Sequence, residues 1–188
     1  MCGRYSLDLE KSKSNFKEET LKKFTKIFSY RDNNISPSSN NPIIYLNNNE
    51  FIFDLFKWGL NFDWLPKGRV LFNVRSETIF EKKFSKDLLL KQRCLVPFNS
   101  YFEWQNRGSL KQKFELKTDK HISYFAAIYS NNGNIKEYSI LTKSSLADIE
   151  HIHNRAPVIV PNKSIKKWFS DGFKEVLSDS VVLKFSEV

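Results

Sequence analysis

The sequence predicts an α+β fold built around a mainly antiparallel sheet. Short runs rich in β-branched and aromatic residues outnumber the stretches with helical spacing. The two kinds do not alternate in the strand–helix–strand order that builds parallel sheets. No internal repeat and no obvious linker divides the 188 residues. We therefore expect one domain over residues 1–188.

Four segments carry helical signals, because apolar residues recur every three or four positions or a capping residue precedes them. Glu18 and Glu19 suit the amino terminus of the first segment. The expected helices are, in order, one carrying Leu21, Phe24, Ile27 and Phe28, one that begins after Glu77 and carries Phe80, Phe84 and Leu88, a short one capped by Ser145 near Asp148, and one capped by Ser164 that carries Trp168 and Phe169.

Six further segments have the composition of β-strands. They are residues 51–58, 93–96, 101–104, 124–129, 138–142 and 158–160. Asparagine-rich patches at 32–34, 40–41 and 47–49 predict turns, because asparagine tolerates left-handed backbone and hydrogen-bonds within its own loop.

The chain is basic, with 30 Lys and Arg against 21 Asp and Glu, a net charge of +9 and a pI near 9.4. A basic balance favours polyanions through steering and counterion release. Lysine-rich soluble proteins are also common, so charge alone leaves nucleic-acid binding and mere solubility equally open. The aromatic fraction of 15% is high enough to fill a core and still leave rings for stacking on bases.

The two cysteines, at positions 2 and 94, do not make a disulfide framework. Charged residues, beginning with Arg4 and Asp8, interrupt the amino terminus where a secretory leader would be apolar. No run approaches the roughly 18 apolar residues that span a bilayer. We expect a cytoplasmic protein with reduced thiols and no membrane contact.

Cys2 directly follows the initiator methionine, and methionine aminopeptidases favour small second residues. Processing would leave an α-amine (pKa about 8) and a thiol (pKa about 8.5) on adjacent carbons. Such a 1,2-aminothiol captures aldehydes, because the amine forms an imine and the thiol closes on the imine carbon to give a thiazolidine. The alternative is an arbitrary residue in a frayed terminus.

Two further residues have side chains suited to proton transfer. Glu103 lies among aromatics in residues 100–104, where burial would raise the pKa of its carboxyl toward neutrality. An edge-strand glutamate that points at water is the alternative. His153 lies two positions after His151, but only His121 remains elsewhere and no acidic or cysteine cluster is near. A proton-transferring or structural histidine therefore fits better than a metal ligand.

Asn73 and Arg75 share one face of an extended segment, where an amide and a guanidinium suit a phosphate and a reacting oxygen. Ser76 and Glu77 after them are explained by capping of the helix that follows. Trp64 lies in a loop with basic residues, where an exposed ring can stack on a base. Trp58 and Cys94, by contrast, are predicted to be core residues.

Seven of these segments, in this order, resemble the SRAP family of SOS-response-associated peptidase-like proteins, whose members sense abasic sites in single-stranded DNA. A cysteine fixed at position 2 makes the match specific. The matching segments are Met1-Cys2-Gly3-Arg4-Tyr5, Asn34-Ile35-Ser36-Pro37, Trp58-Gly59-Leu60, Asn73-Val74-Arg75-Ser76-Glu77-Thr78, Arg93-Cys94-Leu95-Val96-Pro97, Tyr101-Phe102-Glu103-Trp104 and His153-Asn154-Arg155-Ala156-Pro157-Val158-Ile159.

The resemblance implies a barrel-like sheet with short flanking helices and a role for each residue. Cys2 would form the thiazolidine crosslink with the abasic sugar, Asn73 would position the terminus, Glu103 would move protons, and His153 would assist sugar ring opening or release of the adduct. The residues implied to contact DNA are Gly3, Arg4, Asn34, Trp64, Arg75, Ser76 and Arg155. No metal or cofactor is implied.

Five positions depart from the family pattern, and none is a proposed catalytic residue. Ala156 stands where methionine is usual, Leu65 where a second tryptophan is usual, and Asn61-Phe62 where Ile-Pro is usual. Ser85 stands where arginine is usual, so Lys82 or Lys83 would have to supply that phosphate contact. The departures therefore affect the predicted DNA contacts more than the predicted catalytic residues.

The resulting hypothesis is a monomeric, nucleoid-associated sensor that crosslinks to abasic sites in single-stranded DNA and so protects the lesion during replication and the SOS response. A lyase activity stays open, because an imine acidifies the neighbouring carbon of the sugar. A second hypothesis is a self-processing cysteine hydrolase with Cys2 as nucleophile and His153 as base. A third is a non-covalent single-strand binder in which Cys2 is incidental.

Overall fold

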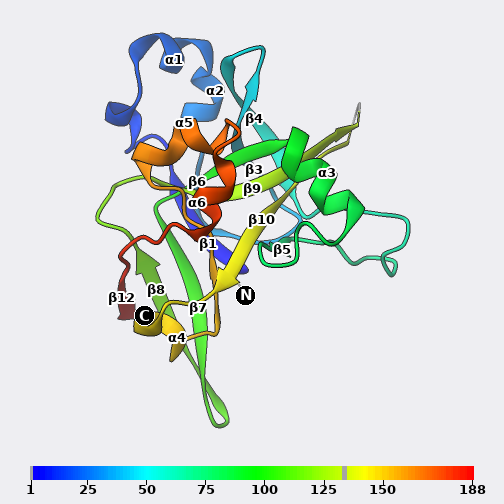
Figure 1. Cartoon of the computed structure of the whole chain (residues 1–188). Coiled ribbons are helices and arrows are strands. Elements are labelled where there is room, and N and C mark those ends of the chain that lie inside the picture. Colours follow the sequence, from blue (N-terminus) through cyan, green and yellow to red (C-terminus); the bar gives the residue numbers. More distant parts are fainter. Residues whose placement is uncertain (1, 133–134) are drawn as a thin grey trace.

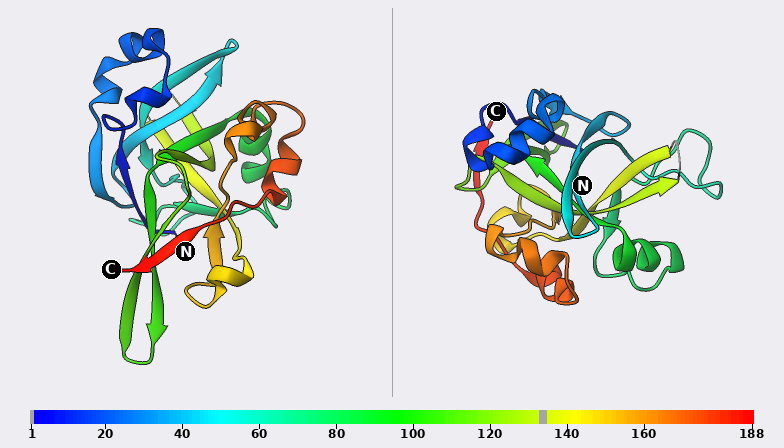
Figure 2. Two further views of the ribbon diagram at one scale, coloured as in Figure 1. Left: turned by 90° about the vertical axis from the view of Figure 1, so that its left-hand side faces the viewer. Right: turned by 90° about the horizontal axis from the view of Figure 1, so that it is seen from above.

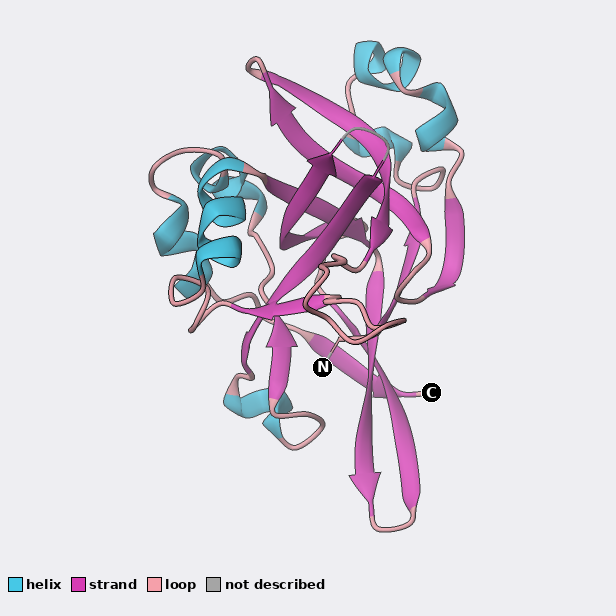
Figure 3. Ribbon diagram, turned by 90° about the vertical axis from the view of Figure 1, so that its right-hand side faces the viewer, coloured by secondary structure: helices cyan, strands magenta, loops and turns pink. Residues whose placement is uncertain are grey.

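The computed structural model describes residues 2–132 and 135–188, whose strands form two mainly antiparallel sheets (Figure 1). Helices lie at the periphery of the strands (Figure 3). This arrangement confirms the predicted α+β fold with a mainly antiparallel sheet. Within the described ranges no helix is both long and apolar enough to cross a membrane.

The first sheet has the strand order β12-β8-β7-β1-β2. Its strands are β1 (Arg4–Asp8), β2 (Arg31–Ile35), β7 (Ser100–Arg107), β8 (Leu110–Lys117) and β12 (Lys184–Glu187). β7 and β8 form a hairpin that extends well beyond the rest of the molecule (Figure 2). Its turn uses Gly108 at a φ of 65°, a conformation that glycine adopts without strain.

The second sheet closes on itself in part. Its strands are β3 (Asn40–Asn47), β4 (Glu50–Trp58), β5 (Asn73–Arg75), β6 (Arg93–Phe98), β9 (Ser123–Asn132), β10 (Ile135–Ser144) and β11 (Arg155–Pro157). β9 pairs with both β6 and β10, and β10 pairs in turn with β4, so the ring β10-β4-β3-β6-β9 is continuous. This ring confirms the barrel-like sheet. β10 pairs in parallel with β4 and β5.

The helices are short and lie around the sheets. They are α1 (Glu18–Lys23), α2 (Thr25–Phe28), α3 (Lys83–Lys91), α4 (Ala147–Glu150), α5 (Ile165–Trp168) and α6 (Phe173–Ser178), with the 3₁₀ turns η1 (Lys13–Asn15) and η2 (Asn162–Ser164). α1 and α2 lie at the same end as the β3–β4 hairpin, and α4 lies near the opposite end beside the β7–β8 hairpin (Figure 1).

Aromatic side chains join the two sheets. Phe125 of β9 stacks on Phe98 of β6 at a centroid distance of 3.8 Å, and the edge of Tyr5 from β1 meets Phe125 at 5.7 Å. The hydroxyls of Tyr5 and Tyr138 are 2.9 Å apart. Each buried ring contributes about 2 kcal/mol by leaving water, so this cluster fixes how the first sheet lies on the second.

Trp58 is a core residue, as predicted. Its ring is fully buried, and its Nε1 donates a hydrogen bond to the Phe72 carbonyl at 2.8 Å. The next residue, Gly59, has a φ of 128°, and a Cβ there would come within 2.5 Å of Val70. Glycine is therefore required at the bend after β4.

Five of the six predicted strands are confirmed, lying within β4, β6, β7, β9 and β10. The sixth prediction, residues 158–160, was misplaced: the strand is Arg155–Pro157, followed by a single bridge between Ile159 and Phe125. The turns predicted at 32–34 and 40–41 are wrong, because these residues belong to β2 and β3. The turn at 47–49 is confirmed, with Asn48 and Asn49 at positive φ.

The helix boundaries differ from the prediction for local reasons. The first helix breaks in two at Phe24, whose φ of −122° and ψ of 36° are not helical. The second begins at Lys83, several residues after Glu77. Neither predicted serine cap forms, because Ser145 Oγ donates to the His153 carbonyl and Ser164 Oγ to the Asp179 carboxylate.

Candidate functional site

Cys2 lies immediately before β1 and is fully buried, so the alternative of a frayed terminus is wrong. Its carbonyl accepts a hydrogen bond of 2.8 Å from Asn73 Nδ2 of β5. Burial raises the pKa of the Cys2 thiol well above its ordinary value, and the negative charge of Glu103 raises it further. A neutral thiol is therefore the resting form at neutral pH.

Glu103 points inward from β7, and only 4% of its surface is exposed. The alternative of an edge glutamate facing water is therefore wrong. The antiparallel register pairs Arg4 with Phe102 and Tyr5 with Tyr101, so one step further places Gly3 opposite Glu103. Burial raises the pKa of the Glu103 carboxyl to about 7. A carboxyl with this pKa exchanges protons efficiently at neutral pH.

His153 lies between α4 and β11 and is half-buried. Its Nδ1 lies 3.0 Å from the backbone N–H of Arg155 and 3.2 Å from the Arg155 carbonyl. In the tautomer that accepts the N–H, Nδ1 is the acceptor and the proton of the neutral ring is on Nε2, whereas in the other tautomer Nδ1 donates to the carbonyl. Burial lowers the pKa of the ring, and the charge of Arg155 lowers it as well. The imidazole is thus neutral at pH 7.

The two neighbouring histidines do not form a metal site. His151 is exposed and contacts the ring of Phe185 at 5.5 Å, on the side of β12. No three His, Cys, Asp or Glu side chains of residues 2–132 and 135–188 come together in a way that could hold a metal ion.

Four sequence-predicted residues come together from distant parts of the chain. Asn73 donates a hydrogen bond to the Cys2 carbonyl, and the charge of Glu103 raises the pKa of the Cys2 thiol. Glu103 and His153 line one hollow of about 420 Å³. Trp104, Asn106 and Lys111 complete the lining of this hollow. The site therefore combines an aminothiol precursor, an amide, a carboxyl near neutrality and a neutral imidazole.

Five of the residues implied to contact DNA lie in two places. Gly3 and Arg4 adjoin Cys2, and Arg4 Nη1 donates to Asn34 Oδ1 of β2 at 3.0 Å. Arg75 is exposed at the end of β5, and the backbone N–H of Ser76 donates to the Thr142 carbonyl at 2.8 Å. Arg4 lies two positions after Cys2 in the chain. Arg75 lies two positions after Asn73, whose side chain donates a hydrogen bond to the Cys2 carbonyl.

Arg155 has a structural partner that the sequence did not indicate. Its guanidinium forms two hydrogen bonds to Glu77, of 2.7 and 2.9 Å, and one to Thr142 Oγ1 at 3.1 Å. These bonds hold the pKa of Glu77 at about 2. The interpretation of Glu77 as a helix cap is wrong, because no helix begins there. The phosphate contact predicted for Arg155 stays a prediction.

Trp64 is 58% exposed, and its indole stacks on Phe62 at 5.2 Å with 14° between the rings. Phe84 contacts both rings. Phe62, one of the departures from the family pattern, thus supports the tryptophan from behind. The exposed face of Trp64 has the geometry of a stacking surface.

The other departures have structural explanations. Ser85 is buried and its Oγ donates to the Ile79 carbonyl at 2.7 Å, so it supports the start of α3 and does not face solvent. Lys82 and Lys83 beside it are exposed. Leu65 is half-buried in the loop, and Ala156 is buried in β11, where it pairs with Lys143 of β10.

Sequence reasoning missed Thr142, Asn106 and Lys111. Thr142 holds Arg155, and the other two line the hollow. Asn106 and Lys111 carry no motif, because their position at the site follows only from the pairing of β7 with β8.

Comparison with solved structures supports the fold. A crystal structure of a protein from Bacteroides thetaiotaomicron superposes with a TM-score of 0.80 at 21% identity, covering 100% of this chain and 92% of that one. A protein from Bordetella bronchiseptica superposes with a TM-score of 0.76 at 17% identity, covering 100% and 99%.

Sequence comparison gives the family. The chain is 26% identical over 182 residues to the abasic site processing protein YoqW of Bacillus subtilis (strain 168), covering 90% of this chain and 80% of YoqW. It is 25% identical over 179 residues to the abasic site processing protein HMCES of Xenopus tropicalis, of which it spans 53%. The family model for SRAP, SOS response associated peptidase, matches residues 1–185. The chain therefore belongs to the SRAP family.

Proposed function

We propose that this protein processes abasic sites in single-stranded DNA by forming a thiazolidine crosslink through Cys2 after Met1 is removed. The observation that carries the proposal is that Asn73 and Glu103 act directly on Cys2, while Glu103 and His153 line one hollow beside it. The names of the relatives, which are abasic site processing proteins, point to the same substrate.

The sugar must first open to its aldehyde. His153, in the tautomer whose Nδ1 accepts the Arg155 N–H, carries its proton on Nε2. It donates to the sugar ring oxygen as the C1′–O4′ bond breaks, while the C1′ hydroxyl loses its proton to give the carbonyl. A neutral imidazole suits this step, because it brings no positive charge beside the α-amine.

The amine of Cys2 then adds to C1′ to give a carbinolamine, which loses water to form the imine. Glu103, with a pKa of about 7, gives a proton to the departing hydroxyl. The nitrogen keeps its proton in this step, so the imine is protonated. The carboxylate that remains takes the proton of the Cys2 thiol, which restores the protonated Glu103. Sulfur bonds to C1′ as the carbon–nitrogen double bond becomes single, and one water is lost in total. A buried thiol of raised pKa needs such a base.

Asn73 sets the direction of the terminus. Its Nδ2 holds the Cys2 carbonyl, and its buried Oδ1 makes no hydrogen bond within the described residues. An unsatisfied buried acceptor costs about 1–3 kcal/mol. The amine freed by removal of Met1 is the donor that satisfies this oxygen, which turns the amine toward the hollow.

The test is to incubate purified protein with an oligonucleotide carrying one abasic site and to look for a heat-stable complex. Its expected mass is the sum of both components minus one water. Cys2→Ala abolishes the complex, whereas Cys94→Ala, which changes the other buried thiol, retains it. No complex with the wild type, or an undiminished one with Cys2→Ala, would refute the proposal. Cleavage of the strand would add a lyase activity.

The hydrolase alternative has less support. A thiolate–imidazolium pair needs a lowered thiol pKa, but burial raises the pKa of Cys2. Intact mass spectrometry of Glu103→Gln and His153→Ala separates the two. Met1 retained only in the variants supports self-cleavage, and equal processing supports ordinary aminopeptidase action. A non-covalent binder would instead show salt-sensitive binding with no preference for abasic over intact strands.

A further inference from the structure

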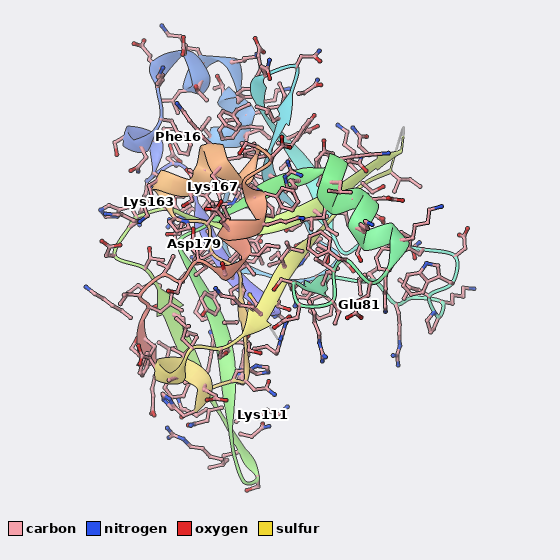
Figure 4. All side chains as sticks on the ribbon, viewed as in Figure 1. Phe16, Glu81, Lys111, Lys163, Lys167 and Asp179 are labelled. Atoms are coloured by element: carbon pink, nitrogen blue, oxygen red, sulfur yellow. The ribbon has the colours of Figure 1, made fainter. Side chains whose placement is uncertain are left out.

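The hollow beside Glu103 and His153 has an outer wall that belongs to no assigned site. Asn106 of β7 and Lys111 of β8 are paired in register and both line the hollow. Lys111 lies on the protruding hairpin (Figure 4). Gln105 Nε2 donates to the His151 carbonyl at 2.8 Å, which ties the hairpin to the segment that carries His153. This bond anchors the hairpin that carries Lys111 beside the segment of His153.

Lys111 differs from the other cations of the hairpin. Arg107 pairs with Glu187, Lys117 pairs with Glu115, and Lys113 lies 4.0 Å over the ring of Phe102. Lys111 is exposed and forms neither an ion pair nor a ring contact with any described residue. Its ammonium is available to an anion from outside the chain.

We propose that Lys111 and Asn106 form a phosphate subsite that takes one of the two phosphodiester linkages flanking the abasic sugar. The inference rests on the proposed function, because Glu103 and His153 place C1′ of that sugar in the same hollow. At about 420 Å³ the hollow lies within the usual range of ligand pockets, about 300–1,000 Å³. The lysine supplies a point charge and the asparagine an amide donor.

The electrostatics of the hollow favour an anion there. His153 is neutral, and Glu103, with a pKa of about 7, carries only part of a charge at neutral pH. The full charge of Lys111 therefore dominates the hollow. A phosphate held at this rim would pull the sugar toward Glu103 and fix its orientation before the imine forms.

The first test measures equilibrium binding of an oligonucleotide with a tetrahydrofuran abasic analogue, which has no aldehyde and cannot crosslink. Lys111→Glu weakens binding at least fivefold, and the slope of log K against log salt falls by about 0.7, the value for one phosphate on a single strand. Lys117→Glu makes the same change of net charge on the same strand and alters binding less than twofold. Equal losses in the two variants, or no measurable binding by the wild type, would overturn the subsite.

The second test replaces each flanking linkage in turn by an uncharged methylphosphonate. We expect the replacement at one of the two linkages to lower the affinity of the wild type. The same replacement should leave the affinity of Lys111→Gln unchanged. An equal fall in Lys111→Gln and in the wild type overturns the inference. Crosslinking of a true abasic site by the wild type tests the proposed function separately, since the analogue experiments need no covalent chemistry.

Discussion

Several buried polar groups lie near Cys2. Asn73 Oδ1 and the Tyr101 hydroxyl make no hydrogen bond within the described residues, and Glu103 is buried with a pKa of about 7. Tyr101 and Glu103 are two positions apart in β7, so their side chains point to the same inward face. Such groups reduce the stability of the fold by about 1–3 kcal/mol each. The region around Cys2 is therefore built for chemistry at the expense of stability.

Glu103 makes stability depend on pH. Its folded pKa of about 7 lies above the ordinary value of 4.5, so folding favours the protonated carboxyl. The contribution of the protonated Glu103 to the free energy of unfolding is fully present below pH 4.5. Roughly 3 kcal/mol of it is lost as pH rises to 7. Glu103→Gln should therefore gain stability over the wild type across this interval, as measured by urea unfolding at several pH values. A constant difference would contradict the raised pKa.

Two buried tyrosines should respond differently to loss of the hydroxyl. Tyr5→Phe removes the bond to the Tyr138 hydroxyl and should cost about 1 kcal/mol of unfolding free energy. Tyr101→Phe removes a hydroxyl without a partner, so stability should stay the same or rise by about 1 kcal/mol. Urea unfolding measures both, and a larger loss in Tyr101→Phe than in Tyr5→Phe would disprove this assignment.

At the scale of elements, Glu77 joins three strands near the site. It follows β5, its carboxylate holds Arg155 of β11, and it accepts the backbone N–H of Ser144 at the end of β10 at 2.9 Å. Arg155 in turn holds His153 through its backbone N–H. This set of bonds fixes the segment that carries the imidazole against the strand that carries Asn73.

Glu77→Gln should loosen this connection. The folded pKa of about 2 lies below 4.5, so the pair stabilises the fold above pH 4.5 and loses its effect as pH falls toward 2. Because 43% of the Glu77 side chain is exposed, the cost at pH 7 should be only about 1 kcal/mol. Urea unfolding measures it, with Glu81→Gln in the same exposed loop as control. Equal effects in the two variants would contradict the role of Glu77.

At the scale of the whole molecule, the net charge of +9 bears on how the substrate arrives. Arg4, Arg75 and Lys111 all lie next to residues of the site, and Trp64 offers an exposed ring. In the proposed function, charge draws a polyanion toward the surface, whereas the hollow acts on one sugar. Encounter and chemistry therefore depend on different residues.

Salt should separate these two stages. Crosslinking to an abasic oligonucleotide at limiting concentration should slow about twentyfold between 50 and 200 mM salt, as expected if about three phosphates are neutralised. Thiazolidine formation with free 2-deoxyribose, which is uncharged, should not change. Rates measured by gel shift and by intact mass test this, and an equal slowing of both reactions would show that charge does not govern encounter.

The sequence predicted the mainly antiparallel class, which the structure confirms, and it pointed to the candidate site residues, whose catalytic roles stay predictions. Both inferences depend on residue identity and on local alternation. The five confirmed strands are rich in apolar and aromatic side chains. The strands that were missed, such as β2 and β8, are polar or lysine-rich and form only because a neighbour pairs with them. The same reason turned two asparagine patches from turns into strands.

What the sequence determined by itself was the aminothiol precursor at Cys2 and the presence of Asn73, Glu103 and His153. Only the tertiary structure decided that Glu103 is buried, that Glu77 binds Arg155, and that Lys111 borders the site. Each of these depends on contacts between residues far apart in the chain, such as the 78 positions between Glu77 and Arg155. Local propensity carries no information on such contacts, which arise when the two sheets pack on a common core.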